Sequence, residues 1–508
     1  MSDPITVANI DLSNITDFQK EMYDVLDENS STSLIPRFLA TFKQRPWSDN
    51  MLIKLSRVEE AGKYIYSPNM KFDFLLYCFY YTQLPFLKVK EEHIDKIQIC
   101  WTHNLAHNIT KKCEMYYDDS TPQTFDTVSL DIYRQFYLKK KLRKTYDINI
   151  GNDPRLISWT SELLGLTIKP HQPWYFSEKE YFALPILQFN DRNDTKKSDI
   201  PIRFIYEFNL DISKLLRMRR LVPDNMASKT KGAYRDEGRM WKDIPCRFEY
   251  LNGVPNTHKL PVPEIYGRHV LITPEERIWY KELCNSKPYK IYITDIISKD
   301  SDNNYKYQSQ ARLDIDYKAS VRALHFVAEN MEAKRNRLYS NYTTNSNDIS
   351  QGYSPIESYE LVYFNAVRIP KTNFEFASEI EANYHFPSVP FEPGYGGLSF
   401  AYGKCSLDKG SVISDTSLSF NKSKAQIVLN LGSTDPYSKS FIPEGIQNGS
   451  NSNGTREDED FETRDLLDSD TTEICETKID SSTNFTIHVR TVIVKKLTFS
   501  NSECQIEI

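Results

Sequence analysis

Alternation of polar and apolar residues near the C-terminal end constrains the fold more than any other feature of the chain. Residues 417–420 and 425–431 both alternate, and a period of two places successive side chains on opposite faces of a β-strand. A polar corner at 421–424 separates the two segments, and a Gly/Ser/Asp-rich connection precedes them. This pattern predicts a β-meander inside a sandwich or a barrel.

Strand patterns recur along most of the chain after Trp47. The clearest is 202–212, where six apolar residues occupy one face. Aromatic residues make up 13% of the sequence, which favours β architecture because flat rings pack well on pleated surfaces. Residues 485–499 are expected to close the chain as a final strand pair. Further strands are predicted at 51–58, 72–81, 96–101, 113–117, 289–297, 311–317, 321–327 and 359–369.

Changes in composition divide the chain. Residues 222–263 contain scattered prolines and little periodicity, so we expect an inter-domain linker between domains at 46–221 and 264–508. Residues 1–45 are interpreted as an N-terminal arm. Helical spacing is found at 128–143, and 273–276 has the Thr-Pro-Glu-Glu pattern of a helix start. Residues 444–482 are Ser/Asn/Gly-rich and then acidic, with eight Asp/Glu against two Arg in 456–470, so they are expected to form a mobile loop.

Charge and cysteine usage limit the class of protein. A net charge of −6 with a pI near 6.0 argues against a dedicated nucleic-acid coat. The eight cysteines form no CxxC pair, which favours reduced thiols over a disulfide framework. The sequence begins without the pattern of a signal peptide, and no run of 18 apolar residues occurs. We therefore expect a soluble, intracellular protein.

Candidate catalytic and binding motifs are few. Cys100, His103, His107 and Cys113 have a spacing that could ligate zinc, although packing and hydrogen bonding explain so loose a cluster better. The glycines at 394–397 precede a predicted strand, which favours a turn over a phosphate site. No HExxH, GxSxG or Walker loop occurs, nor the H-x-H pair of a cupin metal site. We expect no catalytic, cofactor-binding or metal site.

Two basic runs, at 139–144 and 214–242, could contact DNA or an acidic membrane. A solvated face, or contact with acidic surfaces of neighbouring subunits, is the interpretation we favour.

Several segments, in order across about residues 100–430, resemble the major capsid proteins of nucleocytoplasmic large DNA viruses. A departure is Tyr117-Asp118-Asp119, which replaces a Gly-Gly turn of that family. The matching segments are Trp101 to Thr110, Asp131-Ile132-Tyr133, Trp174-Tyr175-Phe176 with Ala183-Leu184-Pro185-Ile186, Thr273 to Tyr280, 321–327, and Ser399-Phe400-Ala401 with Gly410-Ser411 and 417–429.

The resemblance implies an all-β fold of two consecutive eight-stranded jelly rolls with short helices and long loop insertions. It implies a structural viral protein that forms pseudo-hexagonal homotrimeric capsomers of an icosahedral capsid. The expected location is the virion, after assembly in the host cytoplasm. Expected partners are copies of the chain, neighbouring capsomers, minor capsid proteins and the inner viral membrane, with no specific nucleic acid and no cofactor.

Two alternatives stay open. One is a double jelly-roll scaffold or minor capsid paralogue that shapes a viral membrane. The other, more remote, is a carbohydrate-binding or cupin-like jelly-roll protein, which no motif in the sequence favours.

Overall fold

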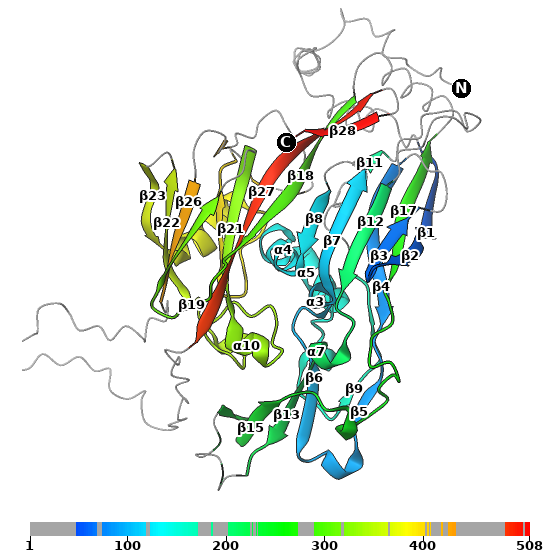
Figure 1. Cartoon of the computed structure of the whole chain (residues 1–508), viewed down its shortest axis with the longest axis vertical. Helices are drawn as coiled ribbons and strands as arrows, with labels where there is room; N and C mark the ends of the chain where they lie inside the picture. The colour runs from blue at the N-terminus through cyan, green and yellow to red at the C-terminus, as the bar shows by residue number, and fades with distance from the viewer. Residues whose placement is uncertain are drawn as a thin grey trace, which may run out of the picture.

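Two β-barrels standing side by side dominate the computed structural model of the chain, and a smaller group of strands lies at one end (Figure 1). The structure describes residues 47–507 except 69–73, 118–121, 171–183, 186–201, 224–225, 227–229, 231, 273–288, 316–319, 364–365, 402–403, 406, 408–417, 420–424, 433–482 and 501–502.

The first barrel consists of two antiparallel sheets. In the β1 sheet the strand order is β1-β17-β4-β10, with β11 also paired to β4; in the β8 sheet it is β2-β3-β12-β7-β8. The strands are β1 (Trp47–Lys54), β2 (Ser56–Glu60), β3 (Lys63–Ser67), β4 (Phe74–Gln83), β7 (Thr110–Tyr117), β8 (Gln123–Asp126), β10 (Thr167–Ile168), β11 (Leu184–Pro185), β12 (Ile202–Phe208) and β17 (Glu264–Ile272).

The second barrel repeats this arrangement. In the β18 sheet the order is β18-β27-β21-β24, with β19 and β28 paired to β27 and β25 to β21; in the β23 sheet it is β20-β26-β22-β23. The strands are β18 (Tyr289–Asp300), β19 (Tyr305–Lys306), β20 (Gln310–Ile315), β21 (Ser320–Asn330), β22 (Ile356–Tyr363), β23 (Ala366–Asn373), β24 (Tyr395–Ser399), β25 (Leu418–Ser419), β26 (Ala425–Leu431), β27 (Asn484–Ser500) and β28 (Glu503–Glu507).

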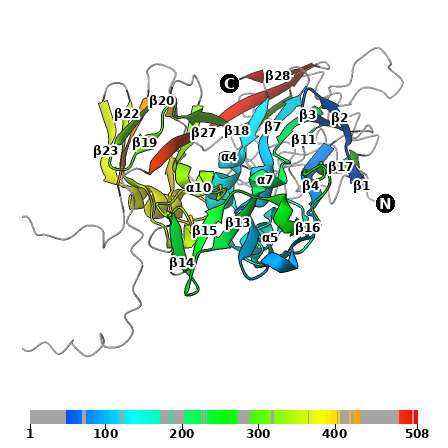
Figure 2. The same ribbon diagram turned by 60° about the horizontal axis from the view of Figure 1, so that its bottom comes forward.

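Three insertions in the first barrel, between β4 and β7, between α5 and β10 and between β12 and β17, build two small sheets at one end. Their strand orders are β14-β15-β13-β6 and β16-β5-β9. Figure 2 shows β13, β14 and β15 grouped there. The insertions also carry α6 (Pro154–Ile157), α7 (Ile212–Leu215), η3 (Glu91–His93) and η6 (Phe248–Tyr250). Their strands are β5 (Leu87–Val89), β6 (Ile97–Trp101), β9 (Glu162–Leu163), β13 (Leu216–Leu221), β14 (Ala233–Asp236), β15 (Arg239–Ile244) and β16 (Leu251–Asn252).

A helical connection follows the last strand of the β8 sheet and another follows the last strand of the β23 sheet. The first helical connection consists of α4 (Thr127–Ile132), the π-helix η4 (Tyr133–Tyr137) and α5 (Lys140–Ile150). The second consists of the π-helix η8 (Phe376–Ile380) and α11 (Glu381–His385). The Asp126 carboxylate caps α4 by accepting from the Ser129 amide. Three more short helices lie in the described residues: α3 (Leu105–Ile109), α10 (Met331–Arg335) and η7 (Ile349–Gln351).

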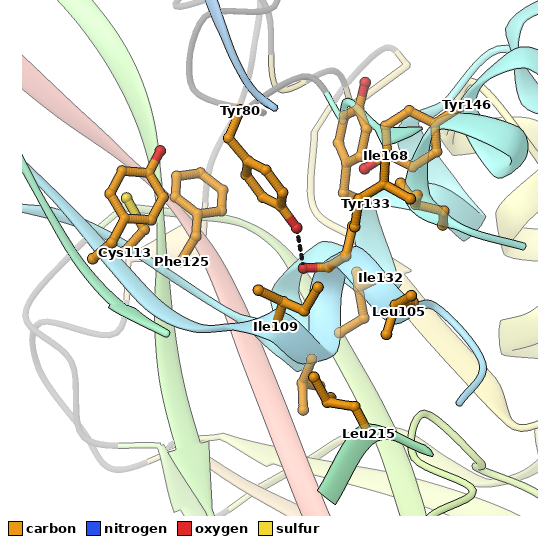
Figure 3. Packing of buried hydrophobic residues seen from close by; sticks show 14 of the residues in the cluster. Tyr80, Leu105, Ile109, Cys113, Phe125, Ile132, Tyr133, Tyr146, Ile168 and Leu215 are labelled. Carbon is orange, nitrogen blue, oxygen red and sulfur yellow. Dashed lines mark hydrogen bonds between the residues drawn. The ribbon is translucent and has the colours of Figure 1, made fainter. Parts of the chain in front are cut away.

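Helix α3 anchors the first helical connection to the interior of the first barrel. Figure 3 shows Tyr80, Leu105 and Ile109 in this packing, and the Tyr80 hydroxyl donates to the Ala106 carbonyl at 2.6 Å. Burial raises the pKa of Tyr80, which keeps it a hydrogen-bond donor. The core cluster of the second barrel is separate and is lined by alternate residues of its two sheets.

The domain boundary predicted at residue 264 differs from the observed strand pairing. Strand β17 pairs with β1 and β4, so it completes the first barrel. The stretch predicted as a linker, 222–263, contains β14, β15 and β16. The stretch 222–263 lacks clear periodicity because its strands are short and belong to the small inserted sheets, not to a barrel wall.

Three strand predictions need correction. The predicted meander is wrong, because β25 pairs with β21 whereas β26 pairs with β20 and β22, so the chain crosses between two sheets. The predicted strand 202–212 ends at Phe208, since Asp211 caps α7. Residues 485–499 form part of one long strand, β27, instead of a strand pair.

Some predictions fall outside the described residues: the N-terminal arm 1–45, the helix start at 273–276 and the acidic loop 444–482. Cys78, Cys100, Cys113 and Cys246 are free thiols. Within the described part of the chain, no helix is long and apolar enough to cross a membrane.

Candidate functional site: the junction between the barrels

The β18 sheet is buried on both faces. Its inner face contributes Leu324 and Phe326 to the core of the second barrel. Its outer face contributes Ala323, Val327 and Val492 to the core cluster of the first barrel. The first helical connection lies against this outer face, between the two barrels (Figure 1). The junction is therefore a continuation of the hydrophobic core.

Strand β8 meets strand β18 at the edge of the junction. The Gln123 side chain donates to the Thr294 carbonyl at 2.6 Å, and the Thr124 amide donates to the Asp295 carboxylate at 3.2 Å. Lys495 forms a buried ion pair with Asp295 at 2.5 Å. Burial raises the pKa of Asp295 in spite of this attraction. These bonds satisfy polar groups at an edge that would otherwise be open.

Aromatic rings fill the centre of the junction. The Phe136 ring lies 4.5 Å from His325 and 5.0 Å from Phe386, between ring centroids. The hydroxyl of Tyr137 is hydrogen-bonded to His325 Nε2 at 2.7 Å. Burial lowers the pKa of His325 to about 3, so this imidazole is neutral at pH 7. A side chain at Gly397 would place its Cβ 2.8 Å from the Phe136 ring, so glycine permits this close packing.

Glu392 from the second half of the chain binds three side chains of the first. Its carboxylate accepts from Arg134 at 2.7 Å and Gln135 at 2.8 Å, and lies 3.0 Å from His103 Nε2. Burial alone would raise the pKa of Glu392, but the charges of Arg134 and His103 lower it to about 2. Asp147 accepts from Arg134 on its other side, at 2.6 Å. The buried guanidinium is therefore held between two carboxylates.

Asp131 is a second buried carboxylate shared by the two halves. It accepts from the Asn104 amide at 2.7 Å and from the Tyr342 hydroxyl at 2.9 Å, and it lies 2.7 Å from His107 Nδ1. The other ring nitrogen of His107 is 3.0 Å from the Tyr146 hydroxyl. Burial and, to a smaller extent, the negative charge of Asp131 raise the pKa of Tyr342 well above its ordinary value.

Arg490 on β27 forms ion pairs with carboxylates of both barrels. The side chain is fully buried and donates to Asp126 of the first barrel and to Asp300 of the second, each at 2.6 Å. His488, two residues earlier, lies 2.8 Å from Asp300 and 3.2 Å from Glu329. Burial would lower the pKa of His488, but the two carboxylates raise it. The arrangement pairs its charges and fixes one placement of the barrels, and it presents no nucleophile with an adjacent base to solvent.

The zinc-like set of the sequence does not come together. His103 binds Glu392, whereas His107 binds Asp131 and Tyr146. Burial raises the pKa of Cys100 to about 12 and that of Cys113 well above its usual range, which disfavours the thiolate that a metal needs. Across the described ranges, no group of three or more His, Cys, Asp or Glu could hold a metal ion. The lack of catalytic, cofactor and metal sites stays a prediction.

The two basic runs separate into exposed and buried residues. Lys139, Lys140 and Lys141 are exposed. In the other run, Arg219 is buried with its guanidinium 4.6 Å from the Trp159 ring and 4.4 Å from the Trp241 ring. It therefore stabilises an inserted sheet by cation–π contacts, a role that the sequence pattern did not indicate.

The junction residues carry weak sequence signals. Arg490 and His488 lie in a run of β-branched residues, and an ionisable residue there suggests a buried partner. Asp126 stands two residues before the start of the predicted helix at 128, close to where a capping residue is expected. Nothing in the sequence pairs Arg490 with Asp126 or Arg134 with Glu392.

Comparison with known proteins identifies relatives. No family model matches the chain. The major capsid protein of Simulium iridescent virus is 22% identical across 80% of this chain and 83% of its own length. For the major capsid protein of Invertebrate iridescent virus 3 the identity is 24%, across 80% and 86%. For that of Lymphocystis disease virus 1 it is 22%, across 80% and 84%. The chain is a homologue of viral major capsid proteins.

Solved structures agree on the fold. A chain of the PBCV-1 virus capsid has a TM-score of 0.56 at 10% identity, with 92% of this chain and 98% of that chain covered. The Faustovirus major capsid protein has a TM-score of 0.52 at 9% identity, covering 90% and 92%. This capsid protein homologue has the double jelly-roll fold, as the resemblance predicted.

Replacing Glu392 with Gln should lower the free energy of unfolding by about 3 kcal/mol, because a buried Arg134 loses one of its two charged partners. Urea denaturation followed by tryptophan fluorescence measures the change. Glu162→Gln, at an exposed position in the inserted region, is the matched control and should change stability by less than about 0.5 kcal/mol. Equal destabilisation by both variants would contradict the role given to Glu392.

The raised pKa of His488 predicts a pH dependence. The ion pairs of His488 stabilise the fold fully below its unfolded pKa of about 6.5 and are lost as pH rises through the higher folded value. The stability difference between the wild type and His488→Gln should therefore shrink as pH increases above about 6.5. Denaturation at a series of pH values measures it, and a difference that grows with pH would contradict the assignment.

Proposed function

We propose that the chain is a major capsid protein of a large DNA virus and that it acts by self-assembly instead of catalysis. The observation that carries this proposal is similarity to viral major capsid proteins across 80% of the chain, through both barrels. In this function three copies form a pseudo-hexagonal capsomer, and capsomers tile an icosahedral shell in the virion.

The architecture supports this function on physical grounds. Two similar barrels per chain turn a threefold oligomer into a six-cornered tile that can cover a surface. Such a tile needs a fixed angle between its barrels, and the buried ion pairs of Arg134 and Arg490 supply one. The inserted strands lie at one end and leave the barrel walls undisturbed. Neighbouring tiles would meet at these walls.

The proposed partners are copies of this chain in the same capsomer, neighbouring capsomers, minor capsid proteins and the inner viral membrane. Assembly would take place in the host cytoplasm. A scaffold or minor capsid paralogue with the same fold would differ in its copy number on mature particles, which quantitative mass spectrometry of purified virions measures.

The purified protein should form a trimer of about 178 kDa, three times the 59.3 kDa of one chain. Obligate interfaces of this kind bury more than about 2,000 Å² per pair, so the trimer should persist at micromolar concentration. Light scattering after size-exclusion chromatography measures the mass, and electron microscopy should show six-cornered particles. A monomer at these concentrations would overturn the proposal.

A further inference from the structure

The two barrels correspond strand by strand. In each barrel the first strand is an edge strand paired with the last long strand: β1 with β17, and β18 with β27. The next strand in the same sheet is β4 in one barrel and β21 in the other. In the opposite sheets, the edge strands followed by a helical connection are β8 and β23. By this correspondence, the first helical connection in the first barrel is equivalent to the second helical connection in the second barrel. The outer face of the β1 sheet is likewise equivalent to the outer face of the β18 sheet.

In the first barrel the helical connection is covered. Every residue of α4 and η4 except Thr127 is buried. Most of the apolar ones share a core cluster with three residues of the β18 sheet: Ala323, Val327 and Val492. Phe136 and Tyr137 of this connection contact His325 of β21. The chain itself thus shows which surface fits over a helical connection of this type: the outside of the next barrel's sheet.

In the second barrel the corresponding connection is open. Phe376, Ile380 and Tyr384 are 38%, 48% and 69% exposed. They are spaced four residues apart on consecutive helical turns, so they form one apolar stripe. Strand β23, which precedes the stripe, is also mostly exposed, and among the strands that the structure describes it pairs with β22 alone. Surfaces of this kind on a soluble chain mark an interaction site.

The corresponding sheet face of the first barrel also carries apolar side chains at its surface. On β17 and β4, Ile265 and Tyr80 face the core, so Tyr266 and Phe79 face outward by alternation. Their rings stack at 5.7 Å between centroids, and Tyr81, 39% exposed, packs beside Tyr266 at 6.4 Å. Leu52 on β1, 48% exposed, lies opposite Arg268 on β17. Aromatic residues at a surface favour protein partners.

We infer that the stripe of Phe376, Ile380 and Tyr384 binds the outer face of the β1 sheet, around Leu52 and Tyr81, on a second copy of the chain. Within one chain, the first helical connection packs on the outer face of the β18 sheet and so joins the two barrels. The inferred contact has the same arrangement, but it joins two chains. Exposed Glu375 and Glu379 flank the stripe, and Arg268 lies on the sheet face, so the charges match. The inference rests on the proposed self-assembly and names the two surfaces that carry it out.

The two surfaces are different and lie on different barrels, so the contact is head-to-tail. Each copy has one stripe and one sheet face. In a heterologous assembly, every stripe and every sheet face is bound only if the copies close into a ring. A two-fold dimer, by contrast, would pair identical patches and could not pair stripe with sheet face in this way.

Single substitutions test each surface in the full-length protein. Ile380→Asp on the stripe and Leu52→Asp on the sheet face should each weaken self-association by about a hundredfold or more, because a charge would be buried in an apolar contact. Both residues are exposed in the single chain, so the melting temperature of the monomer should be unchanged. Met226→Asp is the matched control: Met226 is 50% exposed in the inserted region, away from both surfaces, and this variant should remain a trimer.

Mixing the two variants tests the head-to-tail geometry. Ile380→Asp keeps an intact sheet face, and Leu52→Asp keeps an intact stripe, so one productive contact can form between them. An equimolar mixture should give a two-chain complex of about 119 kDa, twice 59.3 kDa, and no trimer. Sedimentation velocity at about 100 µM, where contacts weaker than micromolar are still populated, measures the masses.

The outcomes separate this inference from the proposed function. If the wild type is trimeric and both variants remain trimeric, the inference is overturned and the self-assembly stands. Two monomeric variants whose mixture also stays monomeric would overturn the head-to-tail pairing. A monomeric wild type would overturn the self-assembly together with this inference.

Discussion

Burial of both faces of the β18 sheet is the constraint on which the rest of the structure depends. A sheet with one solvated face can alternate polar and apolar residues, whereas a sheet covered on both sides needs apolar residues on both faces, and any polar residue there needs a buried partner. Strand β21 accordingly places Ala323 and Val327 against the first barrel and Leu324 and Phe326 in its own. The helical connection from β8 supplies the cover, so the first barrel is part of the packing of the second.

Charged groups in this junction determine geometry more than they add stability. Desolvation offsets much of the attraction in a buried ion pair, and apolar residues of similar shape often serve as well. Arg490, however, donates to Asp126 in one barrel and Asp300 in the other. Both bonds form only at one relative placement of the barrels. Arg134, held by Asp147 and Glu392, imposes the same condition from the other side of the helical connection.

Local periodicity predicted the strands that have one covered face. Strand β20 alternates between exposed and buried residues along its whole length, as its sequence pattern requires. Periodicity assigns a residue to a face and not to a neighbour, so it could not show that β17 returns to β1 or that β26 leaves the sheet of β25. Arg134 and Glu392 are 258 positions apart, and Arg490 and Asp126 are 364 apart, so no local signal joins them. The arrangement of the strands in two consecutive jelly rolls was predicted by the resemblance to capsid proteins, and periodicity alone could not predict it.

The two uses of the stacked helical connection differ in chemistry for a physical reason. Within a chain the barrels are tethered, so their contact forms during folding and can include buried charges whose net contribution to stability is small. Between chains, association must overcome lost translational and rotational freedom, and apolar burial is the favourable term that is available. Phe376, Ile380 and Tyr384 provide apolar area, whereas a network like that of Arg490 would have to be desolvated on each encounter. In this chain, ion pairs fix the angle between the barrels and apolar contacts join the copies. The shape of the capsomer and the affinity of its assembly therefore depend on different interactions.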